Sequence, residues 1–208
     1  MGRDLVGALL VADGGTDAEV RARIVEVEAY LGGDDPASHA YRGPTPRAAI
    51  MFGRPGRLYV YLSYGIHNCA NVVCGADGTA SAVLLRAAAV ELGEATVRAR
   101  RGPSPAFARL LSGPGNLCKG LGIAAGDNGA DLCAPGRFHL EAATLRPPLS
   151  VGGRVGVSRA AGLPLRFWWA SHPAVSAPRS QRFQGEKERD RREGRSLNSV
   201  PIVVGRPT

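Results

Sequence analysis

The stretch that most constrains the fold is residues 23–31, which has the sequence R-I-V-E-V-E-A-Y-L. Side chains on a β-strand point alternately to the two faces of its sheet, so residues two apart share a face. One face of this stretch has Val25, Val27, Ala29 and Leu31, and the other has Ile24, Glu26, Glu28 and Tyr30. The pattern predicts a strand with an apolar face and a second face on which two acids and a tyrosine lie together.

A long polar loop and then a hairpin are expected next. Residues 32–56 are interrupted by glycine and proline and show no periodic pattern, which is typical of a functional loop. Its polar residues include Asp34, Asp35, His39, Arg42 and Arg47. A strand is predicted over 57–63, and the chain returns over 66–73. Because Gly65 tolerates the positive φ of a tight turn, Tyr64 is expected at the hairpin tip, where its ring can protrude.

Short elements are expected in the rest of the chain. A helix is predicted over 5–10 with Asp4 as its cap, a strand over 81–88, helices over 90–100, over 104–111 and from 113, and strands over 152–158 and 165–170. Arg86 is the only charge in the strand 81–88, and the acidic strand can supply its partner. Strands and helices without regular alternation indicate an α+β fold in place of a doubly wound sheet.

Charge narrows the choice of partner without deciding it. The chain has 208 residues, enough for one domain with a proper core, and a net charge of +8 that suits a polyanion such as nucleic acid. Of its 26 basic residues only Lys119 and Lys187 are lysines. A GC-rich genome also produces this skew, so charge alone leaves nucleic-acid binding open.

Several classes of protein are excluded by what the sequence lacks. It has no apolar run long enough to span a bilayer and no signal-peptide pattern, so a soluble, cytoplasmic protein is expected. Its cysteines, Cys69, Cys74, Cys118 and Cys133, form no C-x-x-C pair and no ligand spacing with histidine. They are expected to be buried free thiols, with no metal, iron–sulfur cluster or other cofactor.

Five ordered motifs resemble one known family. They are V-E-A-Y-L at 27–31, H-A-Y-R-G-P-T-P-R from His39, M-F from Met51, L-Y-V-Y-L-S-Y-G-I-H-N-C-A-N from Leu58 to Asn71, and G-P-G-N-L-C from Gly113. Together they closely resemble the alkyladenine (3-methyladenine) DNA glycosylases of the mammalian type, over about residues 4–179. The resemblance implies a single compact domain over 1–180 with an antiparallel, barrel-like sheet, peripheral short helices and a protruding hairpin. In that family the first helix begins further upstream, which indicates a late start or a truncation at Met1.

The resemblance also assigns roles to single residues. Glu28 matches the glutamate that deprotonates the water attacking the sugar, and Arg86 matches the arginine that helps to hold this water and is expected to keep Glu28 ionised. Tyr30, His39 and Tyr61 match the residues that wall the pocket for the extruded base. Asn71 matches an asparagine that disfavours guanine, and Tyr64 matches the residue that is inserted into the duplex. Without the resemblance, each of these residues has an ordinary structural explanation, such as a stabilising Glu28–Arg86 ion pair.

These inferences predict a monofunctional DNA glycosylase in base excision repair. It is expected to act as a monomer on double-stranded DNA that contains alkylated or deaminated purines, associated with the nucleoid of a bacterial-type cell. No lysine matches a Schiff-base role, so hydrolysis without strand cleavage is expected. The alternatives are a basic nucleic-acid-binding protein that has lost catalysis and an interaction module without a nucleic-acid role.

Two regions depart from the family pattern. Arg47 is followed by Ala48, where the family commonly has asparagine, so the support that this loop gives the pocket is open. Residues 181–208 are charged, poor in apolar residues and outside the resemblance, so a disordered tail is expected there.

Overall fold

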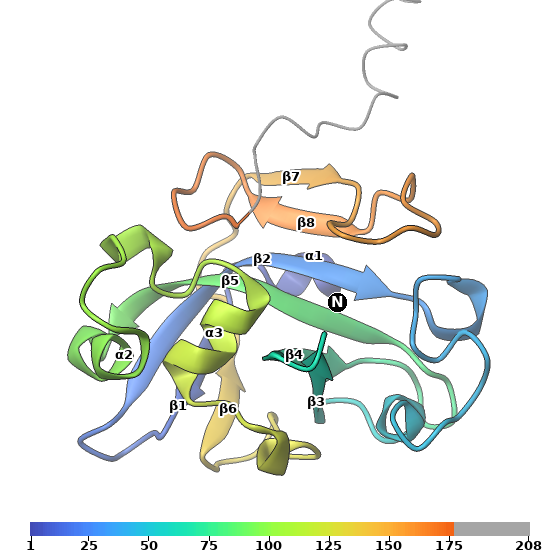
Figure 1. Ribbon diagram of the computed structural model, residues 1–208, viewed down its shortest axis with the longest axis horizontal. Coiled ribbons are helices and arrows are strands. Elements are labelled where there is room, and N and C mark those ends of the chain that lie inside the picture. The colour runs from blue at the N-terminus through green and yellow to red at the C-terminus, as the bar shows by residue number, and fades with distance from the viewer. Residues whose placement is uncertain (177–208) are drawn as a thin grey trace, which may run out of the picture.

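The sheet is built on its longest strands, β2 (Val20–Tyr30) and β5 (Ala82–Leu92), which pair along most of their length. The computed structural model describes residues 1–176 (Figure 1). On its other edge β2 pairs first with β1 (Leu9–Ala12) and then with β8 (Arg166–Trp169). The acids of β2 therefore lie between β5 and β8, in the interior of the sheet.

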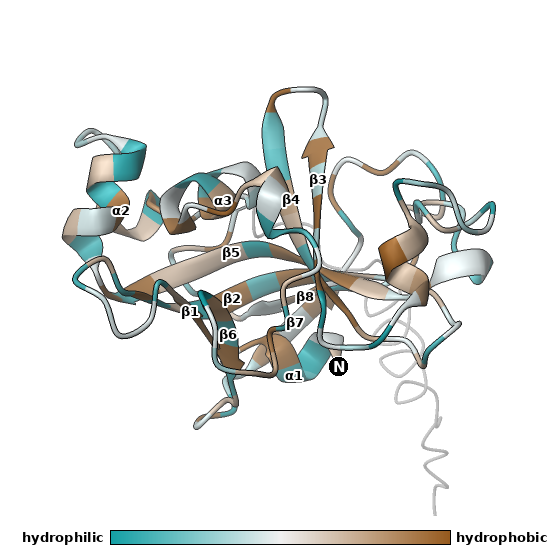
Figure 2. Cartoon of the chain, turned by 90° about the horizontal axis from the view of Figure 1, so that it is seen from below, coloured by the Kyte–Doolittle hydropathy of each residue, from teal (hydrophilic) through white to brown (hydrophobic). Residues whose placement is uncertain are grey.

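Antiparallel pairing continues through the other strands. The main order is β3 (Leu58–Ser63), β4 (His67–Val73), β5, β2, β1 and β6 (Phe138–Glu141), while β7 (Leu149–Gly152) pairs with β8. The sheet curls into a half-barrel, and the β3–β4 hairpin projects from it (Figure 2). The prediction of an α+β fold with a barrel-like antiparallel sheet is confirmed.

Helices are few and short. They are α1 (Gly2–Leu5), α2 (Glu94–Arg101) and α3 (Pro114–Leu121), with 3₁₀ turns at Gly32–Asp34, Ala49–Phe52, Phe107–Arg109 and Ala125–Asp127. α2 and α3 pack together, and α3 covers β4 and β5 (Figure 1). Its buried side chains, Leu117, Cys118 and Leu121, join the main core between the helices and the sheet. No helix within residues 1–176 is long and apolar enough to cross a membrane.

Some predicted elements are wrong in type or extent. The helix over 5–10 is wrong because α1 ends at Leu5 and residues 9–12 are a buried strand between β2 and β6. The helix predicted from residue 90 begins only at 94, after β5 has ended, because Gly93 turns the chain with a φ of 85°. Residues 104–111 form only a 3₁₀ turn, and β7 ends where the strand over 152–158 was expected to begin.

A pair of bulges also changes which β2 side chains share a face. Ile24 pairs with Ala88, Glu26 with Ala87, and the next pair joins residues 27 and 85, so Val25 and Arg86 are each an extra residue in the ladder. A bulge reverses the alternation of side chains beyond it. Ile24 therefore lies in the main core, and the prediction that it shares a face with Glu26 is wrong.

Two further predictions concern the thiols and the tail. All four cysteines are free, and Cys69 and Cys118 are buried as expected. Cys133 is exposed, so the prediction of burial is wrong for that residue, which lies in a surface turn outside the sheet. The expected tail at 181–208 lies outside the described residues.

Candidate active site

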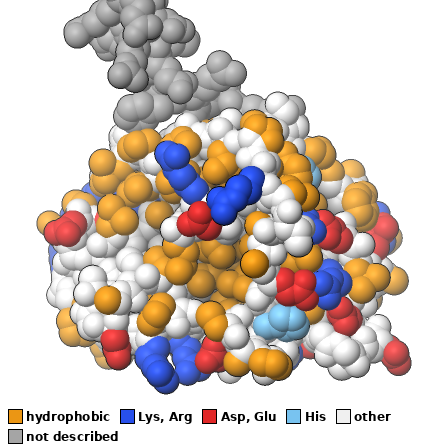
Figure 3. All heavy atoms as spheres, turned by 180° about the vertical axis from the view of Figure 1, so that it is seen from behind, with side chains coloured by type: hydrophobic (Ala, Val, Ile, Leu, Met, Phe, Trp, Pro, Cys, Tyr) orange, Lys and Arg blue, Asp and Glu red, His pale blue; other side chains and the backbone are white. Residues whose placement is uncertain are grey.

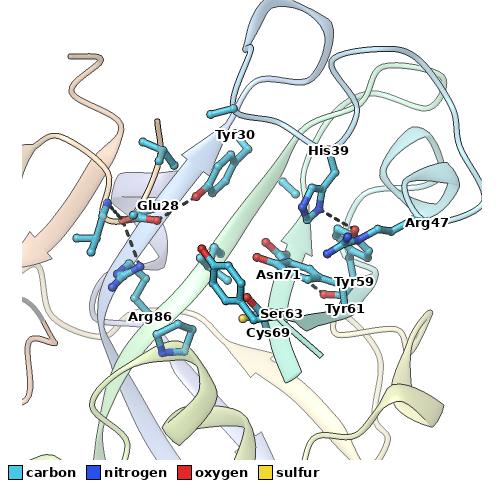
Figure 4. Close-up of a pocket in the computed structure, with 18 of the residues that line it drawn as sticks. Glu28, Tyr30, His39, Arg47, Tyr59, Tyr61, Ser63, Cys69, Asn71 and Arg86 are labelled. Atoms are coloured by element: carbon cyan, nitrogen blue, oxygen red, sulfur yellow. Dashed lines mark hydrogen bonds and ion pairs between the residues drawn. The ribbon is translucent and has the colours of Figure 1, made fainter. Parts of the chain in front are cut away.

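The predicted site residues line one cavity of about 750 Å³, shown in Figure 4. Its lining includes Glu28, Tyr30, His39, Tyr61, Tyr64, Asn71 and Arg86. They come from β2, the loop after it, the β3–β4 hairpin and β5, and the segment 155–159 closes one side. Folding thus brings together residues that are up to 58 positions apart between Glu28 and Arg86, and it places the segment 155–159 beside them.

Glu28 lies at one end of the cavity, and its carboxylate is held on three sides. Oε1 accepts a hydrogen bond of 2.6 Å from the backbone N–H of Val155 and lies 3.3 Å from Nη1 of Arg86, while Oε2 accepts a 3.1 Å hydrogen bond from the hydroxyl of Tyr30. The Glu28 side chain is fully buried. Burial raises the pKa of Glu28 and outweighs Arg86, which acts to lower it. Arg86 was expected to keep Glu28 ionised; it does act in that direction, but burial has the larger effect on the pKa.

Arg86 finds the acidic partners that its sequence context predicted. Besides Glu28, its Nε donates to Oε1 of Glu26 at 2.9 Å and its Nη2 donates to Oγ of Ser176 at 3.2 Å. The bulge in β5 makes Arg86 an extra residue between the two pairs that flank it. One guanidinium therefore connects the cavity acid to a deeper acid.

Behind Tyr30 lies a buried ion pair that the sequence did not reveal. The Arg154 guanidinium lies 4.6 Å from the Tyr30 ring centroid and binds both carboxylate oxygens of Asp35, one through a 2.8 Å hydrogen bond from Nη2. Arg154 Nη1 also donates to the carbonyl of Ala29 at 3.0 Å. Since Val155 follows directly, this pair fixes both a pocket wall and the amide that binds Glu28.

Three aromatic rings meet on the opposite wall. The His39 and Tyr61 rings pack edge to face with centroids 4.6 Å apart, and His39 Nδ1 lies 3.0 Å from the Tyr59 hydroxyl. The Arg47 guanidinium lies over Tyr61 at 4.8 Å. Tyr59, which the sequence did not single out, is thus the residue that orients His39. Burial lowers the pKa of His39, so the imidazole resists protonation.

Ala48, which departs from the family pattern, and Arg47 before it lie in different environments. Ala48 is fully buried in an apolar cluster with Met51 and Tyr59, beneath the aromatic wall. Arg47 is exposed at the cavity rim. A small apolar residue at position 48 therefore packs under the pocket without a polar contact to it.

Asn71 and Tyr64 occupy contrasting environments. Asn71 is buried at the cavity floor, and its amide nitrogen donates to the carbonyl of Tyr59 at 3.1 Å. Tyr64 lies at the hairpin tip with 91% of its surface exposed and a φ of 49°, which non-glycine residues rarely adopt. Leu62 and Ile66 beside it are also exposed, so the tip is a small apolar projection at the cavity mouth.

The cavity can therefore supply a buried carboxylate at one end and aromatic faces along its walls. Within residues 1–176 no group of three or more His, Cys, Asp and Glu side chains is arranged to hold a metal ion. Arg154, Val155 and Tyr59 are the contributors that sequence reasoning missed. The sequence R-V-G-V at 154–157 contains Arg154 and Val155, but it was interpreted as part of the strand predicted over 152–158.

Comparison with known proteins gives one consistent result. The family described as Methylpurine-DNA glycosylase (MPG) matches residues 1–173. A protein of Mycobacterium sp. strain KMS is 50% identical over 183 residues, which cover 85% of this chain and 87% of the relative. A protein of Mycobacterium tuberculosis strain H37Rv is 51% identical over 183 residues (84% and 86%), and one of Cutibacterium acnes is 48% identical over 168 residues (77% and 87%). All three are provisionally named 3-methyladenine DNA glycosylase.

Proposed function

This chain belongs to the methylpurine-DNA glycosylase family, and from that premise we propose that it extrudes alkylated or deaminated purines from duplex DNA and hydrolyses their glycosidic bond with a water activated by Glu28. As a DNA glycosylase it is a hydrolase that acts on DNA in repair. We also propose that it acts as a monomer.

The observation that supports the proposal most is the environment of Glu28. A general base is most effective when its pKa lies near the working pH, and burial raises the pKa of this carboxyl. In the proposed step Glu28 takes a proton from water, the water oxygen bonds to the sugar C1′ carbon, and the bond from C1′ to the base breaks with its electron pair leaving on the base. The carboxylate also opposes the positive charge that develops on the sugar.

The aromatic walls suit the leaving base. Alkylated purines are often cationic, and a cation is attracted to the face of an aromatic ring. Tyr30, His39 and Tyr61 would hold such a base between them, with Glu28 at its sugar side. Asn71 at the floor is proposed to crowd the amino group of guanine and so to disfavour that base.

Extrusion needs a group that replaces the base in the stack. Unstacking costs a few kcal/mol per base step, and an inserted side chain offsets that cost. We assign this role to Tyr64, whose ring is exposed on the apolar hairpin tip beside the cavity.

Cleavage of the DNA strand is not expected. A glycosylase with lyase activity needs an amine that forms a Schiff base with the sugar. No lysine lines the cavity in the described part of the chain. The abasic product should therefore remain intact until it is treated with alkali.

A defined duplex tests the proposal directly. With one hypoxanthine or one methylated adenine in the duplex, the wild type should yield strand breaks after hot alkali and none before it. Glu28→Gln should reduce excision roughly 10²–10⁴-fold, the contribution typical of a general base. Equal excision by the variant would show that another group is the base, and binding without excision by the wild type would favour the non-catalytic alternative.

A further inference from the structure

Glu26, the second acid of β2, is absent from the cavity lining and yet is fully buried among charged groups. Its Oε1 accepts hydrogen bonds from Nε of Arg86 at 2.9 Å and from Nε of Arg166 at 2.8 Å. Its Oε2 accepts a 2.6 Å hydrogen bond from the backbone N–H of Ser176. An acid is buried in this way only when its surroundings compensate its charge, so the cluster is a built feature of the fold.

The cluster determines how Arg86 is oriented. Arg86 is bound at Nε by Glu26 and at Nη2 by the Ser176 hydroxyl, which leaves Nη1 as the nitrogen that faces Glu28, at 3.3 Å. A free guanidinium pairs with a carboxylate through two parallel hydrogen bonds. Held as it is, Arg86 makes a single long contact with Glu28, and much of the hydrogen-bonding capacity of Glu28 is left for other groups.

We propose that Glu26 is a positioning residue of the glycosylase reaction, which holds Arg86 away from a two-point pair with Glu28 and so keeps Glu28 available as a base. The proposal rests on the role assigned to Glu28 above. Glu26 itself does not line the cavity. Arg166 balances the charge of Glu26, so that Arg86 is shared between the two acids.

The charged and titratable groups around Glu28 give the direction of the effect on its pKa. They are Glu26 and Tyr30 on β2, Arg86 on β5, Arg154 after β7, and Arg166 on β8, which pairs with Glu28 in the sheet. Burial raises the pKa of Glu28, Arg86 lowers it and the charge of Glu26 raises it. Removing the charge of Glu26 takes away one influence that raises the pKa and frees Arg86 to pair more closely. Both changes lower the pKa of Glu28.

The test is the pH dependence of single-turnover excision from the lesion duplex with saturating enzyme, where the rate reports the bound complex. Glu26→Gln should move the acid limb of the profile to lower pH and lower the maximal rate roughly 100-fold, as a misplacement of about 1 Å does at a reacting centre. Glu26→Asp keeps the charge but draws the carboxylate back from Arg86, so its acid limb and its maximal rate should both change less than those of Glu26→Gln. Affinity for the duplex should be unchanged in both variants.

A matched control is Asp13→Asn. Asp13 is also a carboxylate shared by two arginines, Arg100 and Arg137, each at 2.8 Å, and it does not line the cavity. This variant should keep the wild-type rate and acid limb even if its thermal stability falls.

The outcomes separate the two proposals. A folded Glu26→Gln protein whose acid limb coincides with that of the wild type overturns the positioning role. Wild-type excision by Glu28→Gln instead overturns the assignment of the base. If circular dichroism shows that Glu26→Gln does not fold, the Glu26→Asp variant is used in its place. A wild-type rate in Glu26→Asp contradicts the positioning role, because the placement of the carboxylate would then not matter. A slower rate at unchanged affinity agrees with that role.

Discussion

Burial raises the pKa of Glu28, Glu26 and Asp35 alike, and the neighbouring arginines decide whether the final pKa lies above or below the ordinary value. It raises the pKa of Glu28, which has one long contact with an arginine. Glu26 and Asp35 are equally buried, but hydrogen-bonded arginines hold the pKa of each below its ordinary value. Three equally buried carboxyl groups therefore differ in function. Glu28 is suited to accept a proton, whereas Glu26 and Asp35 stay ionised and stabilise the structure.

The Asp35–Arg154 pair should be essential for stability, because both side chains are fully buried. Asp35→Asn leaves a buried guanidinium uncompensated and should lower the free energy of unfolding by about 3 kcal/mol or more at neutral pH. Since the folded pKa of Asp35 lies below its ordinary value of 3.8, its contribution is present above that pH and is lost as the pH falls through the folded pKa. The gap in unfolding free energy between wild type and variant, measured by chemical denaturation, should therefore narrow in acid.

The neighbouring Asp34 provides the control for that measurement. Asp34 is exposed, so Asp34→Asn should change the free energy of unfolding by no more than about 0.5 kcal/mol. If the two variants proved equally stable, the Asp35–Arg154 pair would not hold the pocket wall as inferred.

Among the elements, the β3–β4 hairpin combines a rigid base with an unusual tip. Its base packs into the core through Leu58, Val60, Ala70 and Val72, whereas Tyr64 at the tip adopts a left-handed φ next to Gly65. A bulky residue in that conformation costs of order 1 kcal/mol. Such strain, together with exposed apolar side chains, is typical of a site that acts on a partner and not of one that stabilises the fold.

Tyr64→Ala should accordingly leave the fold intact and impair action on DNA. Loss of the ring removes stacking worth about 1–3 kcal/mol per base, so excision at limiting enzyme should fall by roughly tenfold or more. Tyr64→Phe keeps the ring and should act nearly as the wild type does. Thermal unfolding measured alongside checks the premise, since a large loss of stability in Tyr64→Ala would mean that the ring packs inside the protein.

At the scale of the whole molecule, the sequence has a net charge of +8, and the described residues show where part of it lies. Figure 3 shows basic and acidic groups close together on the back of the molecule, with apolar side chains between them, and no continuous basic field on that face. At the cavity, by contrast, the exposed Arg47 and Arg159 lie on the rim. Contacts with DNA phosphates are therefore expected around the cavity mouth.

Affinity for duplex DNA should fall steeply as salt is added, with a slope of about −0.9 in log affinity against log salt for each phosphate contact. Arg159→Ala should reduce the magnitude of that slope by about 1. Arg98 is the matched control, because it pairs with Glu94 on α2 and does not line the cavity, so Arg98→Ala should not change the slope. A fluorescence titration at several salt concentrations measures the slope for the wild type, Arg159→Ala and Arg98→Ala. If the affinity of the wild type did not change with salt, duplex DNA would not be the partner.

The sequence by itself determined the elements whose pattern is local. Alternation over 23–31, the turn at Tyr64-Gly65 and the apolar run at 81–88 each specify a strand or a hairpin, because side-chain direction and turn conformation depend on neighbouring residues. The family motifs then singled out Glu28, Tyr30, His39, Tyr61, Tyr64, Asn71 and Arg86, which do line one cavity.

Only the tertiary structure decided how that cavity is set up. The paired bulges that bring Arg86 between two acids arise from the register of β2 against β5, and the amide that binds Glu28 comes from Val155, 127 positions away. The sign of each pKa shift follows from such contacts, since desolvation and Coulomb terms depend on distance in space and not on separation along the chain. A residue pattern can name a buried acid, but its surroundings in the fold determine whether that acid serves as a base or as an anchor.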